Sequence, residues 1–398
     1  MAAGSGLPPP GSAREVFGAF LRLGLTSFGG PVAHLGYFRR ELVQRRGWVD
    51  EGRFAELVAL CQFLPGPASS QLGFALGLTR AGWGGALAAF FAFTLPSALA
   101  LYAFAMALPA IPPAATAVLV HGLKLAAVAV VAQALVAMAR SLCPDVPRAL
   151  LAVAAAVLML TAGAAWMQVV LVAAGALVGL ALHDISVPPQ AEPIALPHGR
   201  KLGAILLVVY AALLAALPLV AAHPDGALAK LAAFYRSGAL VFGGGHVVLP
   251  LLDEALVRPG WIARDEFLAG YGAAQAIPGP LFTIASFLGA RMGGAVGALG
   301  AVAAIFLPGL LLVAGTLPFW RAIAAHPNAG RAVAGASAAV VGLLAAAFVD
   351  PVCASAVHSV ADVAIAAGAL AMLVLLRAAP PWAVAACVAA TGVEALLA

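Results

Sequence analysis

The chain has 398 residues, of which 64% are hydrophobic and only 9% are charged, with a net charge of +5. Soluble domains average about 25% charged residues, so this composition excludes an ordinary soluble protein and indicates an α-helical protein embedded in a lipid bilayer. The chain has no run of Lys or Arg of the kind that binds nucleic acid, and we expect no nucleic-acid partner. The four cysteines are scattered without metal-ligand spacing, and we expect no metal or cofactor.

The chain starts with residues rich in Gly, Pro and Ala, and we expect residues 1–13 to form a disordered tail. The segment that follows is apolar, carries Arg22 in its middle and stops at Gly29-Gly30. A charged side chain in such a segment faces the protein interior or water, or reaches a lipid headgroup. Both interpretations of Arg22 stay open at this point.

The next stretch, 37–53, is a charged amphipathic loop with five arginines. An excess of Lys and Arg in a short loop is typical of the cytoplasmic side of a membrane. The matching loop of the second half, 251–267, has two arginines beside four acids. Equivalent loops with different charge indicate opposite membrane faces, as in an inverted repeat.

Two helical segments, 54–64 and 68–78, surround Pro65-Gly66-Pro67. Proline removes an amide donor and clashes with the preceding turn, so we expect the triplet to break the helix and not merely to kink it. Freed backbone groups in a bilayer need protein or water partners. The break should therefore line a cavity, between two half-helices or in a re-entrant hairpin.

Apolar helices are expected at 83–108, 114–139, 150–165 and 168–182, followed by a proline-rich linker at 184–200. The linker divides an N-terminal transporter repeat, 14–183, from a C-terminal one, 201–398, which opens with an extra helix at 201–220. We expect about 10–13 membrane segments in an all-α integral membrane protein.

The second half repeats the breaks of the first. Phe242-Gly243-Gly244-Gly245-His246 corresponds to Phe28-Gly29-Gly30, and Gly260-Trp261 corresponds to Gly47-Trp48. Gln275-Ala276-Ile277-Pro278-Gly279-Pro280 corresponds to Gln62-Phe63-Leu64-Pro65-Gly66-Pro67, an offset of 213 residues. Such self-similarity indicates a duplicated unit. Paired Gly/Pro interruptions in two pseudo-symmetric halves predict a substrate site at their interface.

A half-helix N-terminus presents free N–H groups and the positive end of a dipole, so each break is a candidate anion site. Small polar residues follow both Pro-Gly-Pro triplets and can donate to oxyanion oxygens. Arg22 and Arg236 share one repeat position, where two guanidinium groups repel each other unless an anion lies between them. A tetrahedral dianion fits these groups. The candidate substrate-binding residues are Arg22, Gly29, Gly30, His34, Gln62, Pro65, Gly66, Pro67, Ser69, Gln71, Arg236, Gly243, Gly244, His246, Gln275, Pro278, Gly279, Pro280 and Thr283.

Coupling of transport to a proton gradient needs a titratable group near the site. His34 and His246 lie beside the Gly-rich breaks, and Glu56 lies in the first half-helix. An ordinary structural role for each of them is the alternative. The apolar segments contain no recognisable catalytic set, so we expect no enzyme.

The FGG, GW and PGP elements in both halves resemble those of the chromate ion transporter family in its long, two-domain form, and the resemblance covers about residues 14–397. It implies two homologous halves in opposite orientation and a multi-pass inner-membrane protein that exports chromate, confers chromate resistance and is coupled to an ion or proton gradient. The halves differ at Pro31 against Gly245 and at Ser69 against Phe282. Sulfate or another tetrahedral oxyanion as substrate, an anion channel, and assembly as a homodimer remain open.

Overall fold

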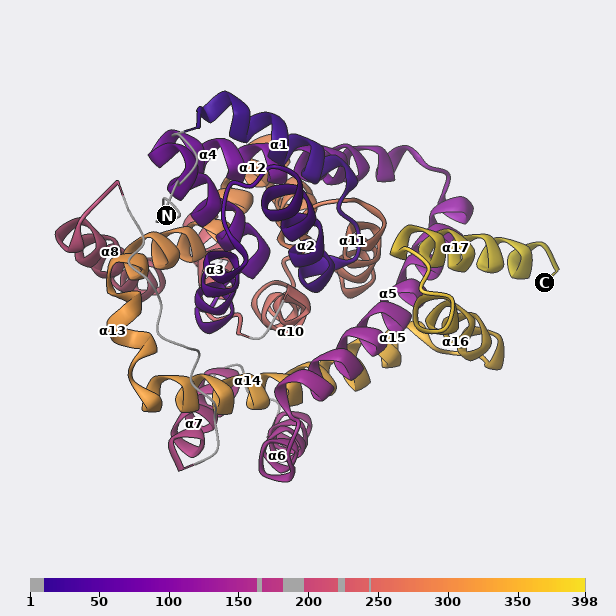
Figure 1. The fold of residues 1–398 in the computed structure, drawn as a ribbon. Helices are drawn as coiled ribbons and strands as arrows, with labels where there is room; N and C mark the ends of the chain where they lie inside the picture. The colour runs from indigo at the N-terminus through magenta and orange to yellow at the C-terminus, as the bar shows by residue number, and fades with distance from the viewer. Residues whose placement is uncertain (1–10, 163–166, 182–196, 221–225, 243–244, 398) are drawn as a thin grey trace.

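The computed structural model describes residues 11–162, 167–181, 197–220, 226–242 and 245–397, and every regular element in these ranges is helical (Figure 1). The tail expected at 1–13 and the linker expected at 184–200 fall mostly outside the described residues. The helices of the first half are α1 (Ala13–Thr26), α2 (Gly30–Phe38), α3 (Glu51–Phe63), α4 (Ala68–Ala107), α5 (Pro113–Leu142), α6 (Val146–Ala162) and α7 (Met167–Ala181), with a π-helix η1 (Arg39–Arg45) and a 3-10 turn η2 (Leu108–Ala110).

The second half repeats this order after α8 (Arg200–Val220), the extra helix that the sequence predicts. Its elements are α9 (Ala227–Ala239), η3 (Gly245–Val247), α10 (Val248–Leu252), η4 (Asp253–Val257), α11 (Arg264–Ala276), η5 (Leu281–Thr283), α12 (Ile284–Thr316), η6 (Leu317–Phe319), α13 (Trp320–Ala324), α14 (Pro327–Ala347), η7 (Phe348–Cys353), α15 (Ala354–Ala356), α16 (Val360–Val374) and α17 (Pro380–Leu397). The prediction of an all-α protein made of two repeats with broken helices is confirmed.

Both Pro-Gly-Pro triplets separate two helices, as the sequence predicts. α3 ends at Phe63 and α4 begins at Ala68, while α11 ends at Ala276 and the turn η5 begins at Leu281. The residues between are extended or left-handed; Gly66 and Gly279 have φ of 127° and 116°. A kink in a continuous helix is therefore excluded in both halves.

The two longest helices, α4 and α12, each fold back on themselves. Backbone angles leave the helical region at Ala81-Gly82 in α4 and at Gly293-Gly294 in α12. A Cβ built on Gly77 would lie 2.4 Å from the carbonyl oxygen of Gly85, which a straight helix does not allow. Each of these helices is thus a tight hairpin of two antiparallel segments.

The long second segments of α4 and α12 run in opposite directions. The first segment of α12 lies parallel to α4, because Ser286 Oγ donates to the carbonyl of Ala98 (2.7 Å) and Arg291 Nη1 to that of Ala105 (3.4 Å). α12 then reverses at Gly293-Gly294. Equivalent helices that run antiparallel are related by a two-fold axis perpendicular to them. In helices that cross a membrane, this arrangement is an inverted repeat.

Each half completes its hydrophobic core with the end of the other half's long helix. Leu312, Val313 and Leu317 pack into the core built on α1, α3 and the start of α4. Leu101 and Ala105 of α4 pack into the core built on α5 and α9 to α12. The two halves are therefore interlocked rather than stacked.

Six helices in the described part of the chain are long and apolar enough to cross a membrane. They are Ala68–Ala110, Pro113–Leu142, Arg200–Leu217, Leu281–Ala324, Asn328–Ala356 and Pro380–Leu397; shorter apolar helices are Val146–Thr161, Met167–Ala181 and Val360–Val374. Large apolar side chains such as Leu87, Leu95 and Leu99 point outward from α4, as a lipid-facing surface requires. The molecule is a multi-pass membrane protein. Figure 1 shows α5 and α14 side by side along one flank, with α16 and α17 at the end of the molecule that carries the C-terminus.

Candidate functional site

The four breaks of the two halves meet in pairs, each pair joining one break from each half. The Gly66 N–H donates to the carbonyl of Val241 (2.7 Å), just before the Gly-rich break of the second half. The Gly279 N–H donates to the carbonyl of Ser27 (2.9 Å), just before the Gly-rich break of the first half. Ser27 and Val241 occupy the same repeat position, so the two hydrogen bonds are related by the pseudo-two-fold axis. The interface that the sequence predicts between the breaks exists in the structure.

The first pair of breaks encloses His34 of α2. The His34 side chain is completely buried, its Nε2 lies 3.3 Å from the Ser27 carbonyl oxygen, and its ring contacts that of Phe93 with centroids 5.3 Å apart. A Cβ on Gly279 would meet Ser97 Oγ at 2.7 Å. These contacts place the α2 histidine, the middle of α4 and the second Pro-Gly-Pro turn around one point.

The second pair of breaks is held by Gln71, in the first turn of α4. Its Nε2 donates to the carbonyl of Pro65 (2.9 Å) and to that of Gly309 in α12 (3.2 Å). Gly309 and Ser97 occupy equivalent positions one residue after Pro308 and Pro96, respectively. Gln71 therefore connects the first Pro-Gly-Pro turn to the long helix of the other half.

The Gly-rich breaks approach each other at Gly30 and His246. A Cβ on Gly30 would lie 3.5 Å from His246 Nε2, and His246 Nδ1 lies 2.8 Å from the hydroxyl of the buried Tyr271. Tyr271 lies one turn before Gln275 on α11, which leads into the second Pro-Gly-Pro turn. The two pairs of breaks are thus neighbours in a single polar region between the halves.

Several buried polar atoms in this region have no hydrogen-bond partner among the residues that the structure describes. They are Ser27 Oγ, His34 Nδ1, Ser70 Oγ, Gln71 Oε1, Thr94 Oγ1 and Gln275 Nε2. A buried polar atom without a partner is costly, so water or a ligand is expected to supply one. The N-cap residues Gly29 and Pro67 make no side-chain capping bond to the first turns of α2 and α4. Hydroxyls, an amide NH₂ and helix N-termini are the groups that bind an oxyanion.

The other predicted site residues differ in whether they lie at the breaks with a free polar group. Pro65, Pro67, Pro278 and Pro280 form the turns themselves, and Ser69 is buried in the first turn of α4. Thr283 is buried, but its hydroxyl donates to the Pro280 carbonyl (2.6 Å) and is not free. Gly243 and Gly244 lie outside the described residues.

Three predicted residues are exposed: Arg22 on α1, Arg236 on α9 and Gln62 on α3. Neither guanidinium group makes a hydrogen bond or ion pair with any residue that the structure describes. Each lies about one helical turn before the end of its helix and therefore close in sequence to a Gly-rich break. The arginine pair around an anion stays a prediction.

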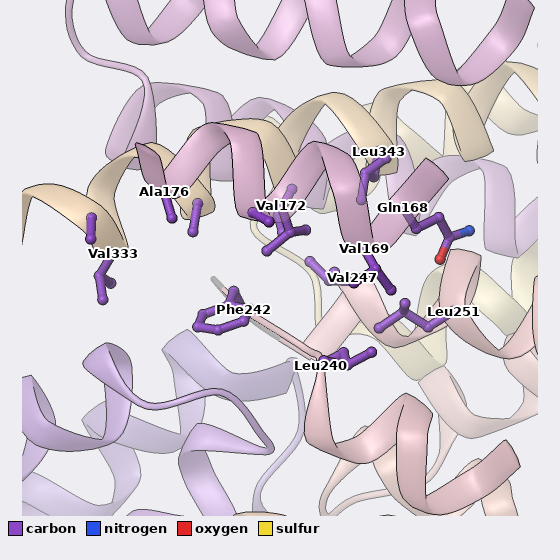
Figure 2. Close-up of a pocket in the computed structure, with 14 residues that line it drawn as sticks. Gln168, Val169, Val172, Ala176, Leu240, Phe242, Val247, Leu251, Val333 and Leu343 are labelled. Carbon is purple, nitrogen blue, oxygen red and sulfur yellow. The ribbon is translucent and has the colours of Figure 1, made fainter. Parts of the chain in front are cut away.

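A cavity of about 380 Å³ lies beside the Gly-rich break of the second half (Figure 2). It is lined by Leu240, Phe242 and Val247 from the break and by apolar residues of α7 and α14. Gln168 is its one polar side chain, and the Gln168 Nε2 donates to the carbonyl of Pro250. An oxyanion needs several donors, so this apolar space does not fit one.

The sequence did not single out Ser27, Thr94, Ser97 or Tyr271 as site residues, whereas Ser70 is one of the small polar residues noted after the first Pro-Gly-Pro triplet. Ser97 follows the Leu95-Pro96 pair, which corresponds to Leu307-Pro308 in the second half. That repeated Leu-Pro pair was the signal that could have found Ser97 and its partner Gly309. Ser27, Thr94 and Tyr271 carry no such signal, because only the packing of the helices brings them to the breaks.

Inverted halves, interrupted helices and a polar region between them define the class of this molecule as a membrane transporter with internal repeats. The sequence profile described as chromate transporter matches residues 14–180 and 228–393, once in each half. The chain is 30% identical over 363 residues to the chromate transport protein of Pseudomonas aeruginosa, covering 86% of this chain and 82% of that protein. It is 29% identical over 381 residues to the chromate transport protein of Cupriavidus metallidurans, covering 92% and 88%.

A probable chromate transport protein of Synechococcus elongatus is also 30% identical over 363 residues, covering 86% of this chain and 85% of that protein. No solved structure matches the chain significantly. The chain belongs to the chromate transporter family. This family is one of transporters and not of enzymes.

Proposed function

We propose that this chain is a secondary transporter that carries chromate, a tetrahedral dianion, out of the cell across the inner membrane and so confers chromate resistance. The substrate follows the family description and the names of the relatives, and export with resistance is what the resemblance to the family implies. The observation that carries the anion site is the reciprocal pairing of the four breaks, Gly66 with Val241 and Gly279 with Ser27.

The chemistry of the paired breaks supports an oxyanion. The unpartnered Ser27 and Ser70 hydroxyls and the Gln275 amide are buried donors at or beside the breaks. The uncapped first turns of α2 and α4 add backbone N–H groups and the positive ends of two helix dipoles. A doubly charged anion gains from every one of these groups, whereas a cation gains from none of the dipoles.

The inverted arrangement suggests how the site opens to each side. Two equivalent halves can exchange conformations, so that each in turn closes one side of the site. His34 and His246 lie at the breaks in non-equivalent repeat positions and are the groups that we propose for coupling to a proton gradient.

Arg22 and Arg236 enter the proposal as free cations near the two Gly-rich breaks. We expect Arg22→Ala or Arg236→Ala to abolish transport while expression and folding persist, because each removes a positive charge that has no acid partner. Uptake of labelled chromate into proteoliposomes measures the effect, with Arg258→Ala as a control arginine that is paired with Glu254. Unchanged transport in both variants would remove the arginines from the site.

Transport by the purified protein in proteoliposomes tests the function itself. Labelled chromate, sulfate and molybdate should be compared with and without an imposed pH gradient. Chromate accumulation driven by the gradient supports a coupled transporter of chromate. Preferred transport of sulfate would identify sulfate, and not chromate, as the substrate. A current that reverses at the anion's Nernst potential without response to pH would indicate an anion channel.

A further inference from the structure

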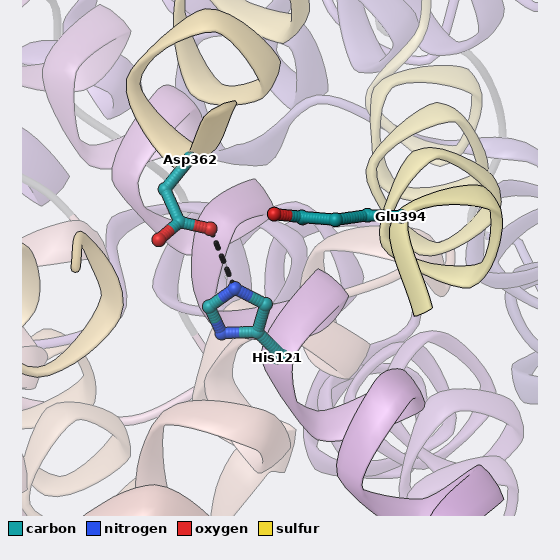
Figure 3. Close-up of side chains that lie close together, drawn as sticks. All are labelled: His121, Asp362 and Glu394. Atoms are coloured by element: carbon teal, nitrogen blue, oxygen red, sulfur yellow. Dashed lines mark hydrogen bonds and ion pairs between the residues drawn. The ribbon is translucent and has the colours of Figure 1, made fainter. Parts of the chain in front are cut away.

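Three ionisable side chains from three helices converge outside the four breaks, at the end of the molecule where α16 and α17 lie (Figure 3). They are His121 of α5, Asp362 of α16 and Glu394 of α17. We propose that these three residues bind one divalent transition-metal ion, with the chemistry of Zn²⁺. The proposal does not depend on the identity of the transported anion.

The donor atoms of the three side chains lie within 4.8 Å of one another. His121 Nε2 lies 2.6 Å from Asp362 Oδ1, and the Glu394 carboxylate points toward both of them (Figure 3). Two ligands of a tetrahedral Zn²⁺ site lie roughly 3.4 Å apart at the usual bond lengths of about 2.1 Å. Side-chain rotations alone therefore bring all three donors to bonding distance.

Hydrogen bonds fix the orientation of the Asp362 carboxylate. Its Oδ2 accepts from the backbone N–H groups of His358 and Ser359 (both 2.9 Å), and the residue is 2% exposed. Oδ1 is left to face His121. Metal-binding carboxylates are oriented by such secondary hydrogen bonds, which fix the free oxygen toward the ion.

Close packing of α17 on α5 fixes the third donor. A Cβ on Gly122 would lie 2.6 Å from the Val388 Cα, and Thr391 Oγ1 donates to the carbonyl of Val118 (3.2 Å). The two contacts show that α5 and α17 run antiparallel, so His121 and Glu394 lie one turn to either side of the contact between Val118 and Thr391. Their side chains extend toward each other across this contact, and their donor atoms lie within 4.8 Å.

The charge of the cluster is unbalanced without a cation. Two carboxylates face one histidine, and no residue that the structure describes forms an ion pair with Glu394. Uncompensated acids in apolar helices are unfavourable. A divalent ion neutralises both carboxylates and takes the histidine as a nitrogen ligand.

The ligand types select among ions. Imidazole nitrogen and carboxylate oxygen are both ligands that Zn²⁺ takes, and a zinc site with three protein ligands keeps a fourth position for water, whereas Mg²⁺ prefers oxygen ligands and keeps its waters. The cluster lies near the start of α16 and the end of α17, and the His121 side chain is 29% exposed. An ion can therefore enter from water at one membrane face.

Binding of Zn²⁺ to the purified full-length protein, stripped with a chelator, tests the site. We expect calorimetry to find one Zn²⁺ per chain and the thermal midpoint to rise, because the ion ties α5, α16 and α17 together. Glu394→Gln and His121→Ala should each weaken Zn²⁺ binding by about tenfold or more. Mg²⁺ at the same concentration should not compete.

Two controls separate the cluster from other ligands. His326→Ala removes an exposed histidine, and Asp145→Asn removes an exposed acid paired with Arg148; both should bind Zn²⁺ as the wild type does. Absence of stoichiometric binding would overturn the proposal and leave His121 and Asp362 as a simple link between helices. Equal binding by Glu394→Gln, His121→Ala and the wild type would overturn it as well.

Discussion

At the breaks, the hydrogen bonds of individual side-chain atoms show which polar residues stabilise the fold and which are available to bind a substrate. Thr283 Oγ1 donates to the Pro280 carbonyl and so stabilises the fold, whereas Ser70 Oγ, at the equivalent repeat position, is buried without a partner in the described structure. A hydroxyl that makes no hydrogen bond within the protein adds nothing to the free energy of unfolding. We infer that the Ser70 hydroxyl serves the transported ion.

Ser70→Ala should therefore weaken transport and leave stability unchanged. Loss of one hydrogen bond to a dianion predicts a rise in KM of about tenfold, which corresponds to roughly 1.4 kcal/mol. Initial rates in proteoliposomes and thermal midpoints check the two parts. Ser141→Ala, which removes a hydroxyl bonded within its own helix, is the control. A lower thermal midpoint with normal KM would make Ser70 structural.

Ionisation of Glu41 in η1 makes the stability of the protein depend on pH in a measurable way. Burial opposes its ionisation, but hydrogen bonds from Arg46 and Arg45 outweigh the burial and lower the pKa of the carboxyl below its usual value. A carboxyl group whose pKa is lowered by folding stabilises the folded state at pH values above its ordinary pKa. This stabilisation is lost as the pH falls through the pKa that the group has in the folded state. Glu41→Gln should reduce the thermal midpoint at pH 7, with the difference from wild type shrinking as the pH falls below about 4. A difference that is constant with pH would contradict the ionic role.

Among the elements, the two Pro-Gly-Pro turns carry the architecture of the site. Each turn needs a left-handed glycine whose N–H reaches the other half of the chain. A Cβ on Gly66 would meet Gln71 Nε2 at 2.9 Å and Gly309 Cα at 3.1 Å. A side chain there would push the halves apart at the point where they are joined.

Gly66→Ala and Gly279→Ala should block transport and destabilise the protein by about 1–3 kcal/mol, since strain and crowding act together. Gly260→Ala is a matched control, because Gly260 also has a positive φ (81°) but a Cβ built there would meet no atom within 4 Å. Thermal unfolding and transport assays compare the three variants. If Gly66→Ala behaves like Gly260→Ala, the close contact between the halves is not needed.

At the scale of the whole molecule, the inverted repeat places equivalent loops on opposite sides of the membrane. Arg40 in η1 and Arg258 directly after η4 are exposed. In a variant without the four native cysteines, Arg40→Cys and Arg258→Cys should react with an impermeant maleimide from opposite sides, Arg40→Cys from the cytoplasm. Labelling of both from one side would contradict the inversion.

The sequence predicts the breaks, the duplication and the extra helix because these depend on Gly, Pro and local apolar runs. It does not predict that Leu312 and Leu101 complete the core of the opposite half, since such pairing depends on packing over more than 200 residues. The exposure of Arg22 could have been read from the spacing of Val16, Phe20 and Leu23, which marks the buried face of α1. Tyr271 and Thr94 reach the site only through the tertiary fold.

The position of a bound oxyanion tests the central claim most directly. Tungstate has the charge and shape of chromate and scatters strongly, so a structure of the protein with tungstate would locate it. We predict density between the four breaks, within hydrogen-bond distance of Ser70 and the first turn of α4 or α2. Density elsewhere in the protein, with the breaks empty, would contradict the account.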